Sequence, residues 1–324
     1  MENSRQGDCK KLFSEILYQA RLLKVTDVIF REGENIYYRI HDDMVRTDGV
    51  CSEEIMGWLH GYLNMSLNVA DGLGQLDIDA SFEAGGRYRI NLFTSEKKRC
   101  SVVRIINDEI LPMAELGIYE GLPELIHERR GINLIAGKTG SGKSTTMASL
   151  MKQLSDRWPW HIITLEDPIE YRIQGTVGLV TQRELGTDFL TFREGIKSAL
   201  RQSPDLIMIG EIRDIDAVRA ALAAAESGTG VLATMHSLGA EQTISRLLAM
   251  YPGEERDFAR YSIAAALNFI QSQVLRRSER GIAMDYELLI ANKGIAATIR
   301  EGRINQLDNL ILLGKKDGMK QFNH

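Results

Sequence analysis

The stretch Gly137-Lys-Thr-Gly-Ser-Gly142-Lys-Ser144 matches the pattern G-x-x-x-x-G-K-[ST] and decides how the surrounding sequence is interpreted. An apolar run, residues 132–136, comes directly before it, and a helix-forming run, residues 144–154, follows. In such a strand, glycine turn and helix, backbone N–H groups and the helix N-terminus can surround phosphate oxygens. The stretch therefore predicts a nucleotide phosphate-binding loop.

Two side chains in this loop have expected tasks: Lys143 reaches the β- and γ-phosphates, and the Ser144 hydroxyl binds Mg²⁺. The alternative is a glycine turn that binds nothing. A chance match to the pattern is uncommon, because only roughly one chain of this length in a hundred would contain one. The flanking runs favour the functional interpretation. The residues expected to hold the nucleotide are Gly137, Thr139, Gly140, Ser141, Gly142, Lys143, Ser144 and Thr145.

After the loop, short apolar runs alternate with helical patterns. The runs at 162–165, 206–209 and 231–234 are typical of strands buried on both faces of a parallel sheet. The best-marked helix spans 216–227, with Asp216 as its expected N-terminal cap. This alternation predicts a doubly wound α/β domain.

Chemically active side chains follow three of these strands. Glu166 follows the run at 162–165, Glu211 follows the run at 206–209, and Thr234 and His236 lie at the end of the run at 231–234. Ligands of such sheets collect at the carboxyl ends of the strands. Alone, each residue could be a helix cap or a solvated side chain. In this order after a phosphate loop, they predict one active site.

The first third of the chain has a different pattern, which predicts a small α+β domain over residues 1–107. Residues 108–118 are expected to connect it to the nucleotide domain, residues 119–324. Ser52 is the expected cap of the second helix. The expected helices span 8–23 and 52–63, and the expected strands span 25–30, 36–40, 76–82, 87–93 and 101–106.

The composition excludes several classes of protein. With 39 basic and 44 acidic residues, the net charge of −5 gives no basic excess for nucleic acid as the main partner. The three cysteines, Cys9, Cys51 and Cys100, are too scattered for a structural zinc site. The first residues lack a secretory signal, and no run of 18 apolar residues occurs. We therefore expect a cytoplasmic protein.

These segments together resemble the secretion ATPase superfamily, the hexameric motors of type II secretion and type IV pili. The Walker A loop is followed by an acidic Asp box (166–171), a Walker B segment of the G-E-x-R-D kind (210–214) and a His box (234–237). The chain looks most like pilus retraction ATPases of the PilT type over nearly its whole length. This resemblance implies a RecA-like P-loop NTPase domain preceded by a smaller PAS-like α+β domain, with ATP and Mg²⁺ as cofactors.

The resemblance also implies a mechanism. Ser144 and Glu211 would organise Mg²⁺, Glu166 would orient and deprotonate water, and His236 would read the γ-phosphate. Glu166 and Glu211 could exchange roles. Asp167, Asp214 and Thr234 are weaker candidates for the same site.

Two arginines of the first domain, Arg89 and Arg104, fit the positions that family members place against a neighbouring subunit's nucleotide. Their spacing of 15 residues does not fix whether they face the same way, and exposed strand arginines can be merely solvated. The resemblance to this family implies a homo-hexamer at the cytoplasmic face of the inner membrane. Its partner would be the pilus platform protein, without direct nucleic acid contact.

Two absences favour retraction over assembly within this superfamily. Extension-type members commonly carry a four-cysteine zinc insert, and residues 119–324 contain no cysteine. They usually also have extra N-terminal domains, which 107 residues cannot hold. Ile295 and Ile299 match the C-terminal segment of the retraction family and predict a docking helix. The alternatives are a pilus assembly or type II secretion ATPase, a nucleic-acid-translocating motor, or a scaffold that only binds nucleotide.

Overall fold

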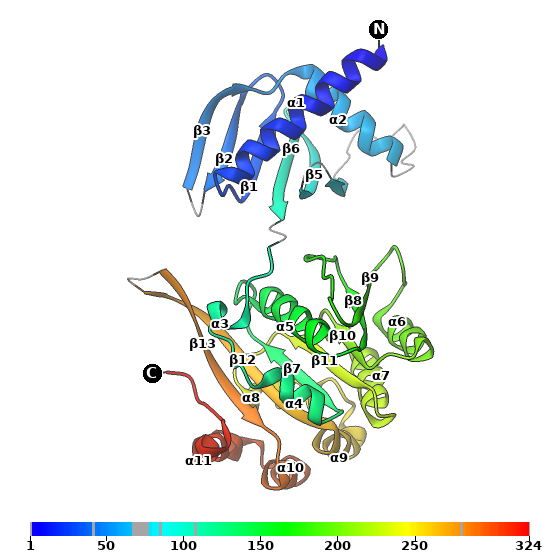
Figure 1. Cartoon of the computed structure of the whole chain (residues 1–324), viewed down its shortest axis with the longest axis vertical. Coiled ribbons are helices and arrows are strands. Elements are labelled where there is room, and N and C mark those ends of the chain that lie inside the picture. The colour runs from blue at the N-terminus through cyan, green and yellow to red at the C-terminus, as the bar shows by residue number, and fades with distance from the viewer. Residues whose placement is uncertain are drawn as a thin grey trace. The chain divides into compact units, whose positions relative to one another are not determined.

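The computed structural model divides the chain into two compact units, Met1–Asp108 and Glu109–His324 (Figure 1). Leu76, Asp77 and Asp108, which belong to predicted segments, lie outside the described residues. Met113 and Ile118, from the expected connection, are buried in the core of the second unit. The boundary at residue 119 stays a prediction. The structure describes residues 2–40, 43–66, 78–83, 86–106, 109–278 and 281–323.

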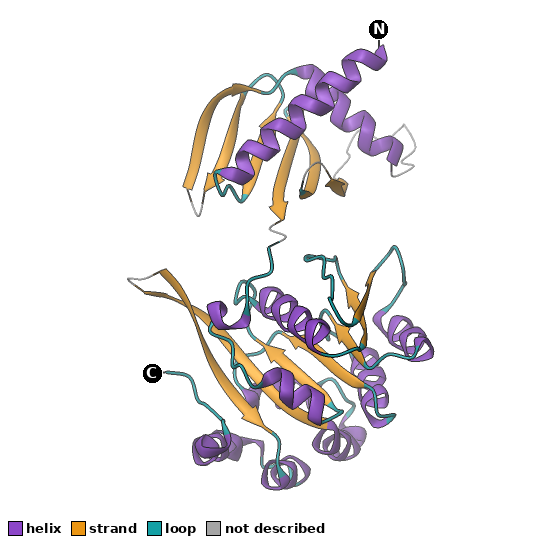
Figure 2. Ribbon diagram, in the orientation of Figure 1, coloured by secondary structure: helices purple, strands orange, loops and turns teal. Residues whose placement is uncertain are grey.

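The first unit is an antiparallel sheet with the order β3-β2-β1-β6-β5-β4, and two helices pack on one of its faces (Figure 2). Phe13 and Leu17 of the first helix belong to its core. The Ser52 hydroxyl accepts a bond from the backbone N–H of Ile55, as expected of a cap. The elements are α1 (Glu2–Leu22), β1 (Asp27–Arg31), β2 (Asn35–Ile40), β3 (Asp43–Val50), α2 (Glu53–Ser66), β4 (Ile78–Glu83), β5 (Arg87–Ser95) and β6 (Lys98–Ile106).

The second unit is a seven-stranded sheet with the order β13-β12-β7-β11-β10-β8-β9, in which only β13 runs antiparallel. Helices α4 and α5 lie on one face and α8 on the other (Figure 1). The strands are β7 (Ile132–Ala136), β8 (His161–Glu166), β9 (Leu179–Glu184), β10 (Leu206–Ile209), β11 (Gly230–Met235), β12 (Leu267–Ser278) and β13 (Gly281–Ile290). The predicted doubly wound α/β fold is confirmed.

The α-helices of the second unit connect and cover these strands. The predicted helix forms as α10, and Ile295 and Ile299 are both buried in the core of the second unit; its docking role stays a prediction. The helices are α3 (Met113–Leu116), α4 (Leu122–Glu128), α5 (Lys143–Arg157), α6 (Phe192–Ala199), α7 (Ile215–Glu226), α8 (Ala240–Ala249), α9 (Arg256–Ala266), α10 (Lys293–Arg300) and α11 (Leu307–Leu313). Among the helices in the described part of the chain, none has the length and apolar character needed to cross a bilayer.

The register of the parallel strands brings their carboxyl ends to one edge. Ala136 at the end of β7 pairs with Met235 of β11, and Ile209 of β10 pairs with both Ala233 and Leu165. Segments that follow four different strands therefore meet at this edge. The sheet order creates the site, because the strand that leads into the glycine loop adjoins β11 rather than the next strand in sequence.

One predicted detail is wrong. The N-terminal cap of α7 is Asp214, whose carboxylate accepts the backbone N–H of Ala217 at 2.8 Å, and not Asp216. Asp216 already lies in the first helical turn, where its side chain is close to Arg193 at 3.7 Å. The cap therefore lies two residues earlier than the sequence pattern indicated, and the helix begins at Ile215.

Candidate active site

The glycine loop joins β7 to α5 in a conformation that requires glycine. Gly142 has φ of +83° and precedes the first residue of the helix. Gly137 has φ of +157°, and a Cβ there would lie 2.3 Å from Ser141 Oγ and 2.7 Å from the main-chain oxygen of Gln273. Both positions thus exclude larger residues. Without side chains at these two positions, the loop backbone can approach a bound phosphate closely.

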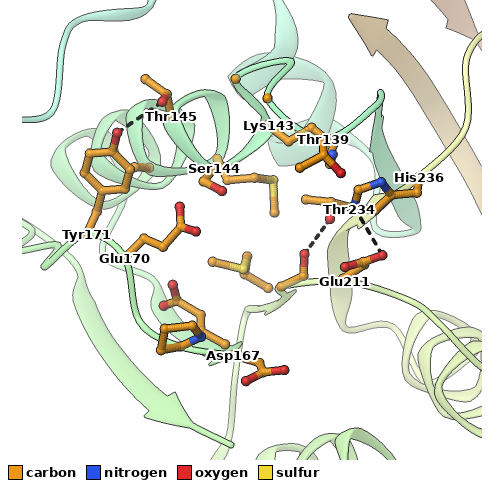
Figure 3. A pocket seen from close by; sticks show the side chains of 18 of the residues that line it. Thr139, Lys143, Ser144, Thr145, Asp167, Glu170, Tyr171, Glu211, Thr234 and His236 are labelled. Atoms are coloured by element: carbon orange, nitrogen blue, oxygen red, sulfur yellow. Dashed lines mark hydrogen bonds and ion pairs between the residues drawn. The ribbon is translucent and has the colours of Figure 1, made fainter. Parts of the chain in front are cut away.

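A pocket of about 580 Å³ opens beside this loop and collects the segments that the sequence singled out (Figure 3). Gly137 and Ser141 do not line it; Gly137 begins the loop and Ser141 is buried. Asp214, a weaker candidate, does not line it either, because its carboxylate caps α7. The other predicted residues of the second unit line the pocket, and Glu170 and Tyr171 join them. Its polar lining includes Thr139, Lys143, Ser144, Thr145, Glu166, Asp167, Glu170, Tyr171, Glu211, Arg213, Thr234 and His236.

Lys143 is held by the loop's own backbone. Its Nζ donates to the carbonyl oxygens of Gly137 at 2.8 Å and Lys138 at 3.1 Å. Burial lowers the pKa of this ammonium, and the nearby carboxylates of Glu211 and Glu170 oppose that effect. The cation therefore has carboxylates across the pocket and carbonyls behind it, which places a positive charge where phosphates are expected.

Glu166 is a buried carboxyl at the end of β8. Its Oε1 accepts hydrogen bonds from Thr164 Oγ1 at 2.7 Å and from Gln182 Nε2 at 2.9 Å. Burial raises the pKa of this carboxyl, and the two hydrogen bonds offset part of the effect. A carboxylate with a raised pKa is a better proton acceptor than an exposed one.

Glu211 lies in a more polar setting at the end of β10. Its Oε2 accepts a hydrogen bond from Arg213 Nε at 2.8 Å, and its Oε1 lies 3.5 Å from Nε2 of His236 (Figure 3). Burial, followed by the charge of Lys143, lowers the pKa of His236. A neutral imidazole can donate or accept a hydrogen bond, so His236 and Glu211 form a polar pair facing the pocket.

Arg89 and Arg104 turn out to be direct cross-strand neighbours on β5 and β6. Both are exposed, and residues opposite each other on paired strands share one face of the sheet. Arg104 Nε also binds Asp27 Oδ1 at 2.9 Å. The pocket lining described above belongs to the second unit alone. The role of the two arginines stays a prediction.

Sequence reasoning missed two supporting residues. Tyr171 OH lies 3.1 Å from Thr145 Oγ1, which links the Asp box to the first turn of α5 (Figure 3). Gln182, which holds Glu166, comes from β9, a strand that was not predicted. Its place as the last residue of the Asp box is a weak signal for Tyr171. No signal in the sequence identifies Gln182, because its contact depends on the pairing of β8 with β9.

The residues present fit a nucleotide with Mg²⁺. The buried Ser141 hydroxyl has no hydrogen-bond partner in the described part of the chain, and a Cβ on Gly140 would meet open space. Within the described residues, no group of three or more His, Cys, Asp and Glu side chains could hold a metal alone. Mg²⁺ would therefore depend on phosphate oxygens and water besides Ser144 and Glu211, as is usual for this ion.

A phosphate loop at the end of one parallel strand, with carboxylates at the ends of neighbouring strands, defines the class of P-loop nucleoside triphosphatases. The comparisons with known proteins narrow this class. The chain belongs to the type II/IV secretion system protein family, whose profile matches residues 83–305, and within it to the PilT-like ATPases.

The similar proteins cover most of the chain. An uncharacterised protein of Escherichia coli, YggR, is 39% identical over 77% of this chain and 77% of its own length. The type IV pilus retractation ATPase PilT of Pseudomonas aeruginosa is 38% identical over 76% of this chain and 72% of its own. The crystal structure of the pilus retraction motor PilT with bound ADP matches with a TM-score of 0.84 at 32% identity, covering 93% of this chain and 89% of that one.

Proposed function

We propose that this PilT-like ATPase is a ring-forming motor that uses ATP hydrolysis to retract a type IV pilus. The observation that carries the proposal is the convergence of the phosphate loop, the Asp box, the Walker B segment and the His box on one pocket. Two similar proteins are named as a pilus retraction ATPase and a pilus retraction motor, which supports retraction over assembly. The ring is a homo-hexamer in this proposal, and its partner is the platform protein at the cytoplasmic face of the inner membrane.

In this mechanism, the loop N–H groups and Lys143 bind the phosphates of ATP. Ser144 and Glu211 would hold Mg²⁺, which would neutralise negative charge on the phosphates. Glu166 orients a water molecule and takes its proton while the water oxygen attacks the γ-phosphorus. The bond from that phosphorus to the leaving oxygen of ADP breaks, and inorganic phosphate is released.

The electrostatics of the two glutamates support this division of roles. The buried carboxyl of Glu166 has a raised pKa, which favours accepting a proton. Glu211 is paired with the guanidinium of Arg213 at 2.8 Å at the edge of the pocket, where its second carboxylate oxygen can bind a cation. His236 lies next to Glu211, and an imidazole N–H can donate a hydrogen bond to an oxygen of the γ-phosphate.

The arginines complete the site from a neighbouring subunit. Arg89 and Arg104 share one face of the first unit's sheet, so a single adjacent phosphate group can meet both guanidinium groups. The two planar guanidinium groups present rigid sets of donors that suit phosphate oxygens. An isolated subunit then lacks part of the charge stabilisation, which makes hydrolysis depend on the ring.

Lys143→Ala tests the enzymatic part of the proposal. We expect the rate of phosphate release from ATP to fall by at least about a hundredfold. The variant lacks the lysine ammonium, which stabilises negative charge on the transferred phosphoryl group. Lys152→Ala is the matched control on the same helix, since Lys152 pairs with Asp156 and does not line the nucleotide pocket. Normal turnover by the Lys143 variant would remove the assignment of the loop.

Deletion of the gene in its own host tests the direction of force. A retraction motor predicts that surface pili persist and no longer shorten, which fluorescence imaging of labelled pili measures. Loss of all surface pili would instead identify an assembly motor. Unchanged pilus number and shortening rate would contradict any role in this pilus.

A further inference from the structure

Strand β12 runs directly beside the start of the phosphate loop. It pairs in parallel with β7, and Ser272 is opposite Ala136, the last residue before the loop. Gln273 follows and is fully buried. The sequence offered no reason to associate this glutamine with a loop more than 130 residues away, yet the sheet order makes them neighbours.

The side-chain amide of Gln273 uses both of its ends on the loop and its helix. Nε2 donates to the carbonyl oxygen of Ser141 at 2.7 Å, and Oε1 accepts from Thr146 Oγ1 at 3.0 Å. Ser141 belongs to the loop, and Thr146 is a buried residue in the first turn of α5. One side chain therefore fixes the spacing between the loop and the helix that follows it.

Gln273 also contacts the two glycines that bound the loop. A Cβ on Gly137 would lie 2.7 Å from the Gln273 carbonyl oxygen, and a Cβ on Gly142 would lie 3.5 Å from Gln273 Nε2. The loop thus packs against this residue at both ends. Two residues further along β12, Leu275 lines the pocket itself, so the strand follows the loop to the nucleotide site.

At Ser141 the loop is held by one backbone hydrogen bond, from its N–H to Lys138 O at 3.2 Å, and by the bond from Gln273. The hydroxyl of Ser141 has no hydrogen-bond partner among the described residues, so its carbonyl bond to Gln273 is the side-chain contact that anchors this position. Replacement of Gln273 by an apolar residue would leave the Ser141 carbonyl and the Thr146 hydroxyl without this partner. Both groups would then favour conformations other than the one seen here.

We propose that Gln273 is a positioning residue for nucleotide binding, which holds the phosphate loop open through Ser141 and Thr146. Gln273 does not line the pocket. It acts by keeping the loop N–H groups in the arrangement that phosphates require, so its effect belongs to affinity more than to the chemical step. The proposal rests on the nucleotide-binding part of the proposed function and not on pilus retraction.

Gln273→Met tests this proposal, because methionine has nearly the same shape but neither donates nor accepts strongly. We expect the affinity for a fluorescent ADP analogue to fall at least about tenfold, with a similar rise in KM for ATP and a much smaller change in kcat. Thr146→Val removes only the second bond and is expected to give a smaller loss of ADP affinity. It also keeps the test decisive if the first variant fails to fold.

The matched control is Asn268→Ala, which removes another buried amide from the same strand. Asn268 donates to Leu125 O at 2.9 Å and to Asn133 Oδ1 at 2.7 Å, away from the loop. We expect this variant to lower the thermal midpoint while its ADP affinity stays within about twofold of the unmodified protein. Wild-type ADP affinity in Gln273→Met and Thr146→Val, or affinity losses that track thermal shifts in all three variants, would overturn the proposal. ADP binding by the unmodified protein without ATP hydrolysis would contradict the proposed function alone.

Discussion

Gly137 is the position where the structure allows the sharpest test of the loop geometry. We predict that Gly137→Ala destabilises the second unit much more than Gly140→Ala, although both changes add one methyl group to the same loop. The two glycines have positive φ, +157° and +75°. They differ in their surroundings, because a Cβ at Gly140 meets nothing within 4 Å, whereas one at Gly137 meets Ser141 and Gln273.

The expected magnitudes follow from these contacts. The hydroxyl of Ser141 can rotate away, but the 2.7 Å approach to the Gln273 carbonyl involves backbone within a sheet. Overpacking of this kind costs about 1–3 kcal/mol, and the unfavourable φ adds about 1 kcal/mol. Gly140→Ala carries only the φ cost of about 1 kcal/mol. For a unit of this size, each kcal/mol lowers the thermal midpoint by about 2–4 °C.

Thermal denaturation followed by tryptophan fluorescence measures the difference, since Trp158 and Trp160 both lie in the second unit. We expect the midpoint of Gly137→Ala to fall by about 4–16 °C and that of Gly140→Ala by about 2–4 °C. Equal shifts in the two variants would refute the claim that the loop is packed against β12. A larger shift for Gly140→Ala would refute it more strongly.

Two further predictions concern a buried carboxyl and a helix cap. Burial raises the pKa of folded Glu166 above 4.5, so its protonated form is favoured and the wild type loses stability as pH rises above that value. Glu166→Gln keeps a side-chain oxygen for the hydrogen bonds from Thr164 and Gln182 but removes the proton acceptor, so it should abolish turnover. Its stability advantage over the wild type in urea unfolding should grow as pH rises above about 4.5; an advantage that shrinks would contradict this sign. Asp214→Ala should lower the free energy of unfolding by about 1 kcal/mol, because the Asp214 carboxylate caps α7. Asp216→Ala should lower it by less than about 0.5 kcal/mol. Denaturant titration measures both values, and the reverse order would favour Asp216 as the cap.

The sequence predicted those parts of the fold whose strands are short and apolar. The strands β7, β10 and β11 are nearly all apolar, and β8 contains the apolar run Ile162–Ile163 followed by Leu165, so their pattern was visible. Strand β12 was missed because Asn268, Gln271, Ser272 and Gln273 are polar and buried at once. Strand β3 is largely exposed and carries no apolar period. Burial of polar groups depends on partners far away in sequence, which a local pattern does not contain.

The candidate site divides in the same way. The loop and the strand-end residues Glu166, Glu211 and His236 were found because chain order places them after parallel strands. The supports Gln182 and Gln273 were not found, because each reaches the site from a strand whose neighbours are set by sheet order. The sequence also did not determine whether the two arginines lie on the same face of the sheet, which follows from the register of β5 and β6.

Mixing two inactive variants tests the central claim, a nucleotide site completed by a neighbouring subunit. Chains carrying Arg104→Ala keep Lys143, and chains carrying Lys143→Ala keep Arg104. In rings formed from equal amounts of both, about a quarter of the interfaces combine an intact loop with an intact arginine. We predict that ATP turnover reappears at a corresponding fraction of the wild-type rate. Mixed rings that stay as inactive as either variant alone, with mixing verified by labelled chains, would contradict the claim.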